Sequence, residues 1–515
     1  MKNPRCVLTV LKHCCTIPKS RPALDRRPPS ASFNLHIPLC DFMAMTTDAS
    51  LNGQATITQD DLASQAGFLK TGPLTHWLSQ ANPTTFSIYC IIAAFGTYFC
   101  MYAFRKPFTA ATYDGMLAFG VGFKTILITA QVAGYTLSKF IGIKVVSEMP
   151  PRYRAISIVA LIAVAELALF LFAVTPVPWN FVWLFVNGLP LGMVFGLVLG
   201  FLEGRAVTEA LSAGLCASFI LSSGFVKSVG RTLIESYHVD TFWMPAVTGL
   251  IFLLPLFLFV WMLSQIPAPS LADEQLRSKR SPMNGQQRRA FWRRHALGLT
   301  GLLTIYVLLT VIRSLRDDFA IEIWSELGVQ NEPTVFARSE FWVMIGVIAI
   351  SGLTSLIRDN RTAFLASIGL LATGFVIVVA SVAGQALGKL SPMAFMVTLG
   401  FGMYIPYVAF HTTVFERMIA ALKETGNIGY LMYLADALGY LGYIGVMLYR
   451  NSITSDQNFL SLMNHTSLIV AGSASAITLF LCVHYTTKIP RLHHDAVLAN
   501  GNMTVPSHTI RPNEH

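Results

Sequence analysis

The stretch Thr97-Tyr-Phe-Cys-Met-Tyr-Ala-Phe-Arg105-Lys106-Pro107-Phe108 places two adjacent cations and a proline at the end of an apolar run. The run Ile305-Tyr306-Val-Leu-Leu-Thr-Val-Ile-Arg313 repeats this arrangement later in the chain. Without a gap, Tyr98 aligns with Tyr306 and Arg105 aligns with Arg313. The sequence therefore predicts two homologous halves, each of which contributes one arginine to a shared central site.

The composition indicates a membrane protein. The chain has 515 residues, of which 53% are hydrophobic and 12% are charged, and its mean hydropathy is +0.55. Soluble domains carry about 25% charged residues, so this chain has too few charges to cover a soluble surface. The formal net charge is +10. The lysines and arginines lie beside apolar segments, which indicates that they set the orientation of the protein in the membrane and do not bind nucleic acid.

Apolar segments predict an all-α membrane protein with twelve transmembrane helices. Each segment is close to the ~20 residues that cross a bilayer as a helix, and lipid leaves few alternatives to helices because it offers no partner to open backbone groups. The predicted spans are 86–110, 118–145, 155–175, 179–203, 210–233, 243–264, 296–320, 336–357, 363–384, 391–415, 426–449 and 466–487. Hydropathy alone would end the first span at Phe104 and the seventh at Ile312, and the longer ends rest on the family resemblance given below.

These spans divide the chain into five parts. We expect a disordered N-terminal tail over 1–84, a six-helix bundle over 85–264, a basic linker over 265–295, a second six-helix bundle over 296–488 and a C-terminal tail over 489–515. A short amphipathic stretch near Thr75–Ala81 is expected on the membrane surface. Lysine and arginine in the linker place it in the cytoplasm. With an even number of spans, both termini are then cytoplasmic.

Several motifs resemble one transporter group. Tyr102-Ala-Phe-Arg105-Lys106-Pro-Phe108 resembles the first-helix sequence of the organophosphate:phosphate antiporter branch of the major facilitator superfamily (MFS). The resemblance extends over residues 85–488, and the chain is also similar to a bacterial group catalogued as a family of unknown function. The other matching motifs are Gly134–Phe140, Arg313–Asp318, Gly400–Pro406 followed by Glu416, and Gly439–Gly442.

The resemblance implies a fold of two pseudo-symmetric six-helix bundles and a multi-pass protein of the bacterial cytoplasmic membrane. It implies a secondary transporter of a small anion, with phosphate or an organophosphate favoured, that works by alternating access. We expect a monomer whose partners are that solute and membrane lipids, without nucleic acid. No phosphate-binding loop, metal-ligand spacing or hydrolase motif is found in the sequence, so neither an enzyme nor a cofactor or metal site is predicted.

Arg105 and Arg313 are the principal candidates for binding the solute. An arginine within a membrane is expensive and normally faces a cavity or a partner. Its guanidinium pairs with phosphate or carboxylate oxygens through two parallel hydrogen bonds. Two such groups from opposite halves would clamp a dianion. The alternative is a structural ion pair, for which Asp317 and Asp318 are available.

Further substrate contacts are predicted with alternatives left open. Lys139 is expected at the site or in a charge network of the loop between helices 2 and 3. Lys227 is expected at the site or as a counter-charge to Asp436 or another acid. The antiporters carry a histidine on helix 5 where this chain has Ser223. The remaining candidates are Lys106, Tyr98, Tyr306 and Tyr404.

Three residues are candidates for proton coupling. Asp436 lies in an apolar run, where an isolated carboxylate can hold a proton, although a static salt bridge is the alternative. Glu166 allows the same two interpretations. His411 is a gate or a proton carrier, or makes an interhelical hydrogen bond. The rival functions are therefore a proton-coupled transporter of another solute and a transporter-like membrane sensor.

Overall fold

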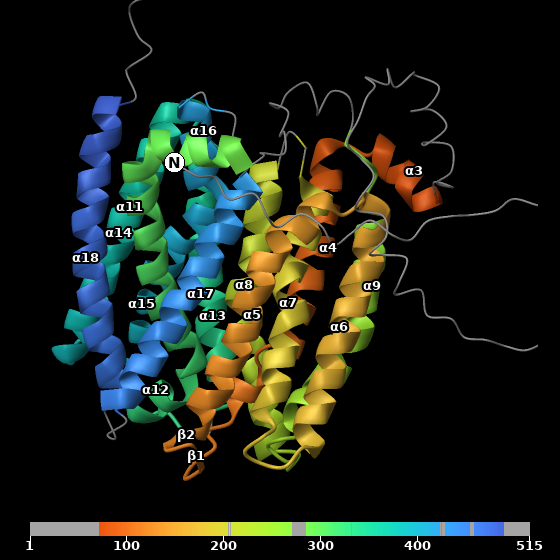
Figure 1. Ribbon diagram of the computed structural model, residues 1–515, viewed down its shortest axis with the longest axis vertical. Coiled ribbons are helices and arrows are strands. Elements are labelled where there is room, and N and C mark those ends of the chain that lie inside the picture. Colours follow the sequence, from red (N-terminus) through yellow and green to blue (C-terminus); the bar gives the residue numbers. More distant parts are fainter. Residues whose placement is uncertain are drawn as a thin grey trace, which may run out of the picture. The chain divides into compact units, whose positions relative to one another are not determined.

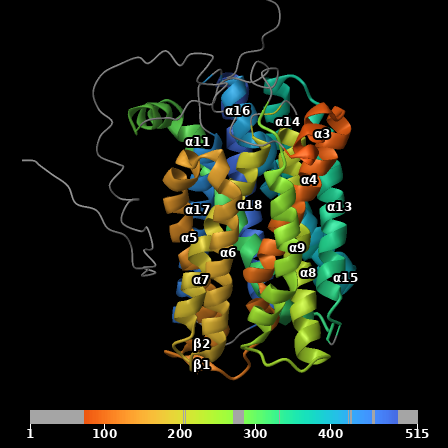
Figure 2. The same cartoon turned by 90° about the vertical axis from the view of Figure 1, so that its right-hand side faces the viewer.

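The computed structural model describes residues 72–488 apart from 204, 206–207, 270–284, 331, 423, 425–427 and 454–457. Within this part of the chain, twelve helices are long and apolar enough to cross a membrane. They stand side by side in one bundle (Figures 1 and 2). The predicted all-α fold with twelve spans is confirmed. Most of the N-terminal tail and the tail 489–515 lie outside the described residues.

Six long helices make up the first half. They are α4 (Pro83–Met101), α5 (Phe123–Glu148), α6 (Pro151–Val174), α7 (Phe181–Leu202), α8 (Thr208–Glu235) and α9 (Met244–Ser264). Two of them, α4 and α6, begin at a proline, which has no N–H to leave unsatisfied in the first turn. The side chain of Asn82 caps α4 by accepting a 2.7 Å hydrogen bond from the backbone N–H of Thr85, as N-cap residues do.

Six further spans make up the second half. They are α11 (Gly285–Asp318), α13 (Val335–Ser355), α14 (Asn360–Ala386), α15 (Pro392–Ala409) with its continuation α16 (Phe415–Ala421), α17 (Ile428–Ile453) and α18 (Phe459–Lys488). One π-helical turn, η3 (Phe410–Val414), joins α15 to α16. The short helix α12 (Ala320–Glu326) follows α11.

Several predicted boundaries were wrong. The range assigned to a disordered tail includes helix α3 (Pro73–Gln80) and the start of α4. The range assigned to the linker includes the first residues of α11, which bends at His295. The first span does not continue to residue 110, because α4 ends at Met101. The second span begins at Phe123 and not at residue 118.

A β-hairpin occupies the place where the second span was expected to begin. Strands β1 (Leu117–Ala118) and β2 (Val121–Gly122) pair antiparallel. The two residues between them, Phe119 and Gly120, both have positive φ (52° and 76°). This is the backbone of a tight two-residue hairpin turn, for which glycine is well suited.

The two halves meet through equivalent helices. The second span of the first half, α5, packs against the fifth span of the second half, α17. In the same way α8, the fifth span of the first half, packs against α13, the second span of the second half. This exchange relates the halves by pseudo-twofold symmetry. It confirms the prediction of two pseudo-symmetric six-helix bundles, which is the MFS arrangement.

Glycines on α7 allow it to approach α5 closely. A Cβ atom on Gly188 would lie 2.8 Å from the backbone nitrogen of Tyr135, and one on Gly192 would lie 2.6 Å from Cβ of Ser138. No larger side chain fits there without moving a helix. Small residues at four-residue spacing serve this purpose in membrane helices.

The two ends of the bundle differ in what they carry. The hairpin β1–β2 and helix α12 lie at one end, called here the hairpin end, and α3 and α16 lie at the other, called the α16 end (Figure 1). Helices α5 and α13 start at the hairpin end, whereas α4, α11 and α17 run toward it. Consequently Lys106, Lys124 and Asp318 lie near the hairpin end, and Lys139 and Asp436 lie nearer the α16 end.

Candidate functional site

A break in the backbone at the end of α4 presents Arg105 and Lys106. The helix tightens into the 3-10 turn η1 (Tyr102–Phe104), and a second 3-10 turn, η2 (Pro107–Ala110), follows the two cations. The backbone N–H groups of Arg105 and Lys106 both bond to the carbonyl of Tyr102, at 3.0 and 2.9 Å. Pro107 contributes no N–H, so the regular helix cannot continue.

Two amide side chains satisfy the carbonyl groups that this break leaves free. Nδ2 of Asn187 donates to the carbonyl of Phe104 at 3.0 Å, and Nε2 of Gln131 donates to the carbonyl of Arg105. Gln131 also donates to Oδ1 of Asn187 at 3.0 Å. Helices α5 and α7 therefore fix the position of Arg105. The sequence interpretation missed both amides, although Gln131, Tyr135 and Lys139 share one face of α5 at four-residue spacing.

Arg105 is surrounded by aromatic rings. Its guanidinium carbon lies 3.8 Å from the centre of the Tyr135 ring, 5.6 Å from that of Tyr102 and 5.5 Å from that of Tyr440. Only 3% of the residue is exposed. These rings stabilise a cation through their electron-rich faces but do not neutralise its charge.

Arg313 lies in a similar environment. It donates a hydrogen bond of 3.3 Å to the hydroxyl of Tyr440, and its guanidinium carbon lies 4.3 Å from the centre of the Tyr407 ring. The residue is 5% exposed. Tyr440 thus contacts both arginines, one from each half. The sequence interpretation did not assign roles to Tyr135, Tyr407 or Tyr440.

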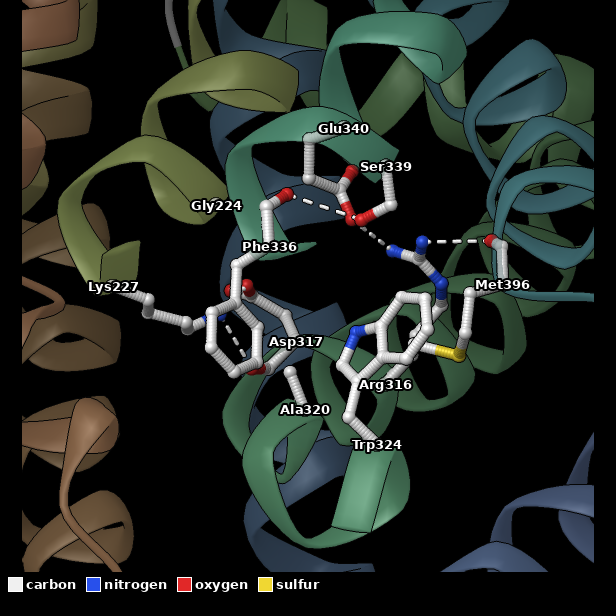
Figure 3. Close-up of a pocket in the computed structure, with 10 residues that line it drawn as sticks. All are labelled: Gly224, Lys227, Arg316, Asp317, Ala320, Trp324, Phe336, Ser339, Glu340 and Met396. Atoms are coloured by element: carbon white, nitrogen blue, oxygen red, sulfur yellow. Dashed lines mark hydrogen bonds and ion pairs between the residues drawn. The ribbon is translucent and has the colours of Figure 1, made fainter. Parts of the chain in front are cut away.

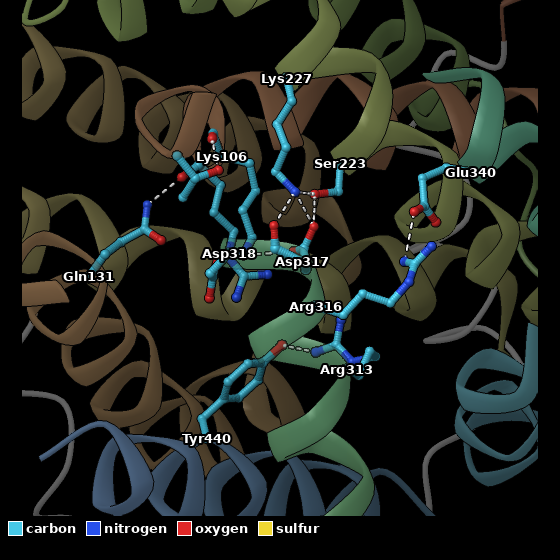
Figure 4. A network of polar contacts seen from close by, with 12 residues as sticks. Lys106, Gln131, Ser223, Lys227, Arg313, Arg316, Asp317, Asp318, Glu340 and Tyr440 are labelled. Atoms are coloured by element: carbon cyan, nitrogen blue, oxygen red, sulfur yellow. Dashed lines mark hydrogen bonds and ion pairs between the residues drawn. The ribbon is translucent and has the colours of Figure 1, made fainter. Parts of the chain in front are cut away.

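Neither arginine forms an ion pair with a carboxylate of the described residues, whereas the other buried cations around them do. Lys106, Lys227 and Arg316 form the ion pairs seen in Figure 4, and Lys139 pairs with Asp436. Apart from Lys124, which pairs with Glu322, six buried cations face four buried carboxylates between the halves, which leaves two positive charges. The cations are Arg105, Lys106, Lys139, Lys227, Arg313 and Arg316, and the carboxylates are Asp317, Asp318, Glu340 and Asp436.

A cluster of ion pairs joins the halves on the hairpin side of the arginines. Nζ of Lys106 lies 2.8 Å from Oδ2 of Asp317 and also pairs with Asp318. Lys227 pairs with Asp317, and the Ser223 hydroxyl donates to the same carboxylate. The structure therefore places Lys106, Ser223 and Lys227 on Asp317 and Asp318. Of the two alternatives for Lys227, it shows a counter-charge to an acid other than Asp436.

A second inter-half pair lies farther toward the hairpin end. Nζ of Lys124 on α5 is 2.5 Å from Oε1 of Glu322 on α12. The pair adds no net charge to the interior. Together with the Lys106 and Lys227 contacts, it joins the two halves toward the hairpin end.

On the α16 side, Asp436 is the centre of another polar cluster. It pairs with Lys139 at 2.8 Å and accepts a hydrogen bond from Tyr306. Nε2 of His411 lies 3.7 Å from Asp436, and Nδ1 of His411 lies 2.9 Å from the carbonyl of Tyr407. Of the two interpretations of Asp436, these contacts match the static salt bridge and not an isolated carboxylate. Tyr306 and Lys139 contact this carboxylate and not an arginine.

Three predicted residues lie outside these clusters. The ring of Tyr98 packs against that of Tyr102, with ring centroids 5.6 Å apart. The ring centroid of Tyr404 lies 6.3 Å from that of Tyr407. Both extend the aromatic wall around the arginines. Glu166 on α6 faces Gly249 on α9, within the first half and away from the central clusters. In the described part of the chain, no group of three or more His, Cys, Asp or Glu side chains could hold a metal ion.

Comparisons with known proteins give one family. A solved structure described as "Crystal structure of D-xylose-proton symporter" shares 13% sequence identity, covers 79% of this chain and 98% of that chain, and gives a TM-score of 0.48. No curated protein matches the sequence. The family model described as "Family of unknown function (DUF5690)" matches residues 107–488, which is more than half of the chain. The chain therefore belongs to the DUF5690 family.

Proposed function

We propose that this protein is a secondary active transporter that moves a small anionic solute, with phosphate or an organophosphate favoured, by alternating access. The observation that supports the proposal is the pair Arg105 and Arg313, which carry the two positive charges without a carboxylate partner. Buried charges are normally paired. A dianion held by both guanidinium groups would complete the charge balance.

The ion pairs on either side of the arginines supply two gates. Lys106 with Asp317 and Asp318 joins the halves toward the hairpin end, and Lys139 with Asp436 joins them toward the α16 end. With both clusters formed, the arginines are nearly inaccessible. Breaking one cluster at a time, while the other holds, would open the site to one side of the membrane, as alternating access requires.

We place the α16 end in the cytoplasm of a bacterium, with both termini there and the protein as a monomer. Arginines concentrate at this end, in agreement with the positive-inside rule: Arg152, Arg289, Arg293, Arg294, Arg358, Arg361 and Arg417. Fusions at the C-terminus test the orientation. A fluorescent protein should fold there and alkaline phosphatase should stay inactive, and the reverse result would contradict it.

Equilibrium binding tests the proposed site. Radiolabelled phosphate should bind the purified protein, and Arg105→Lys or Arg313→Lys should weaken binding about 10- to 100-fold, because each lysine loses one of two parallel charge-assisted bonds. Arg338→Lys, at an exposed position of α13, is the matched control and should bind normally. Equal binding by all variants would exclude the two arginines as the site.

Proton-coupled transport of another solute is the second candidate. The observation that favours it is the Asp436 cluster, in which a histidine and a tyrosine contact a buried carboxylate. Uptake that depends on a proton gradient but not on internal phosphate would support this function. Phosphate exchange independent of pH would count against it.

A further inference from the structure

A small cavity lies at the boundary of the two halves beside the Lys227–Asp317 pair (Figure 3). Its volume is about 10 Å³, which is room for about one water molecule. Its wall comes from α8 of the first half and from α11, α12, α13 and α15 of the second. The polar side chains that line it are Lys227, Arg316, Asp317, Ser339 and Glu340.

Glu340 is incompletely hydrogen-bonded in this cavity. Its Oε1 atom accepts a hydrogen bond of 2.7 Å from Arg316, but its Oε2 atom is buried and has no partner among the described residues. Only 8% of the residue is exposed. A buried, ionised carboxylate oxygen without a donor is unfavourable. A proton on Oε2 would remove the charge and turn that atom into a donor for water in the cavity.

The other three buried carboxylates between the halves are better satisfied. Asp317 accepts from two lysines and a serine, Asp436 from a lysine and a tyrosine, and Asp318 from Lys106. None of the three has an oxygen that is buried without a partner in the described structure. Because hydrogen bonds to the ionised form favour that form, Glu340 is the one of these four carboxylates that gains most from binding a proton. Glu322 on α12 also has an oxygen without a partner among the described residues, but that residue is only partly buried.

The charged and titratable groups around Glu340 come from three neighbouring helices. Arg316 and Asp317 face it from α11, Lys227 from α8 and Tyr404 from α15. Lys227 is already bonded to Asp317, and Arg316 also donates to the carbonyl of Met396 at 2.9 Å. Protonation of Glu340 therefore leaves both cations with another partner and does not require the Lys227–Asp317 pair to break.

We propose that Glu340 is the proton-binding site of the carrier and that its proton is taken up together with the anion. The coupling rests on the proposed function, whereas the proton site itself does not. A proton from solution adds to Oε2 and gives a neutral acid, so the excess charge between the halves rises from two to three. The added charge strengthens anion binding at Arg105 and Arg313, and by linkage the bound anion strengthens proton binding equally.

The position of Glu340 also limits which side of the membrane can supply the proton. A Cβ atom on Gly224 of α8 would lie 2.6 Å from Cγ of Glu340, so the two halves touch beside the cavity. Glu340 is near the start of α13, at the hairpin end. Separation of α8 from α13 would expose it to that side, whereas separation at the α16 end would leave the α8–α13 contact at Gly224 in place.

Infrared difference spectroscopy of the purified full-length protein tests the proton site without any ligand. One component of the carboxylic-acid C=O absorption that appears as the pH is lowered, and that shifts in D₂O, should belong to Glu340 and should be lost in Glu340→Gln. Glu340→Asp retains the carboxyl group and should shift this band, which provides a second assignment if the glutamine variant does not fold. Glu166→Gln is the control, because its carboxylate also has a buried oxygen without a partner, and it should leave the Glu340 band unchanged.

The coupling is measured by repeating the titration with inorganic phosphate. Phosphate should move the midpoint of the Glu340 band to higher pH by about one unit, which corresponds to the roughly tenfold coupling typical of linked sites. A band that survives unshifted in both Glu340 variants would overturn the proton site. If the pH midpoint of the Glu340 band does not shift when phosphate binds, the coupling is overturned. If phosphate does not bind at all, the proposed solute fails, while the ligand-free titration still decides the proton site.

Discussion

Arg313 donates a hydrogen bond of 3.3 Å to the hydroxyl of Tyr440 and not to either aspartate that follows it in the chain. Spacing alone favours a pair with Asp317, which lies one helical turn away on α11. Asp317 is instead held by Lys106 and Lys227 from the other half. The lysines of the first half thus leave the arginine of the second half free for a ligand, and the predictions below depend on this division.

Removal of an unpaired buried charge should stabilise the folded protein, whereas removal of a paired one should destabilise it. Without added anion, Arg105→Gln should stabilise the protein by about 1 kcal/mol, because a buried charge without a counter-charge is lost. Lys106→Gln should destabilise it by about 3–5 kcal/mol, because Asp318 loses its cation. Thermal unfolding in detergent measures both. A loss of stability in Arg105→Gln as large as that in Lys106→Gln would show that Arg105 has a structural partner.

The hairpin-end gate should open when its ion pairs are broken. In a background without the eight native cysteines, Lys124→Cys and Glu322→Cys should cross-link efficiently with a short bifunctional reagent. Asp318→Asn should lower the yield, because α11 is then held less tightly to Lys106. The exchange of charges in Lys106→Asp with Asp318→Lys should restore it. A yield that does not change with Asp318→Asn would separate this cluster from gate closure.

Helix α7 should tolerate a methyl group at one glycine of its small face and not at another. Gly188→Ala meets the backbone of α5, with the Tyr135 nitrogen at 2.8 Å, and should destabilise the protein by about 1–3 kcal/mol. At Gly200 the nearest atom is Cζ of the Arg154 side chain, at 3.0 Å, which can move, so Gly200→Ala should be nearly neutral. Melting temperatures compare the two. Equal losses would contradict the close α5–α7 contact.

Acid should weaken one contact at the α16 end. Burial raises the pKa of Glu424, but hydrogen bonds from Arg294 and His295 outweigh this effect and hold the pKa below its ordinary value. A carboxyl group whose folded-state pKa is lowered stabilises the protein above its unfolded pKa of about 4.3, and this stabilisation is lost as the pH falls through the folded value. The wild type should therefore have a higher melting temperature than Glu424→Gln near neutral pH, and the gap between the two melting temperatures should close in acid. A gap independent of pH would contradict the ion pair.

Much of the architecture could be predicted because hydropathy and length decide which segments cross a bilayer. The gap-free repeat of Tyr98 and Arg105 at Tyr306 and Arg313 also located the two arginines on equivalent helices. Hydropathy alone ends the first span at Phe104, close to the break, and the wrong end at residue 110 came from the family resemblance. The side chains that hold the break, Asn187 and Gln131 from other helices, could not be predicted. Hydropathy does not report such side-chain to backbone bonds.

The partners of the charged residues were harder to predict for a similar reason. Alignment of the halves sets Ser223 opposite Asp436, since both lie on the fifth span of their half, but equivalent positions do not face each other. The pseudo-twofold arrangement packs α5 on α17 and α8 on α13. Lys139 on α5 therefore reaches Asp436, while Lys227 on α8 reaches Asp317. These pairings follow from the packing of the halves and not from local sequence.

Counterflow of labelled phosphate tests the central claim most directly. Proteoliposomes that contain the protein and are loaded with unlabelled phosphate should accumulate labelled phosphate from outside, and Arg338→Lys should behave as the wild type does. Arg105→Lys and Arg313→Lys should each abolish accumulation, because either change removes one side of the proposed anion clamp. Accumulation that persists in both variants, or its absence in a well-folded wild-type preparation, would contradict a two-arginine phosphate carrier.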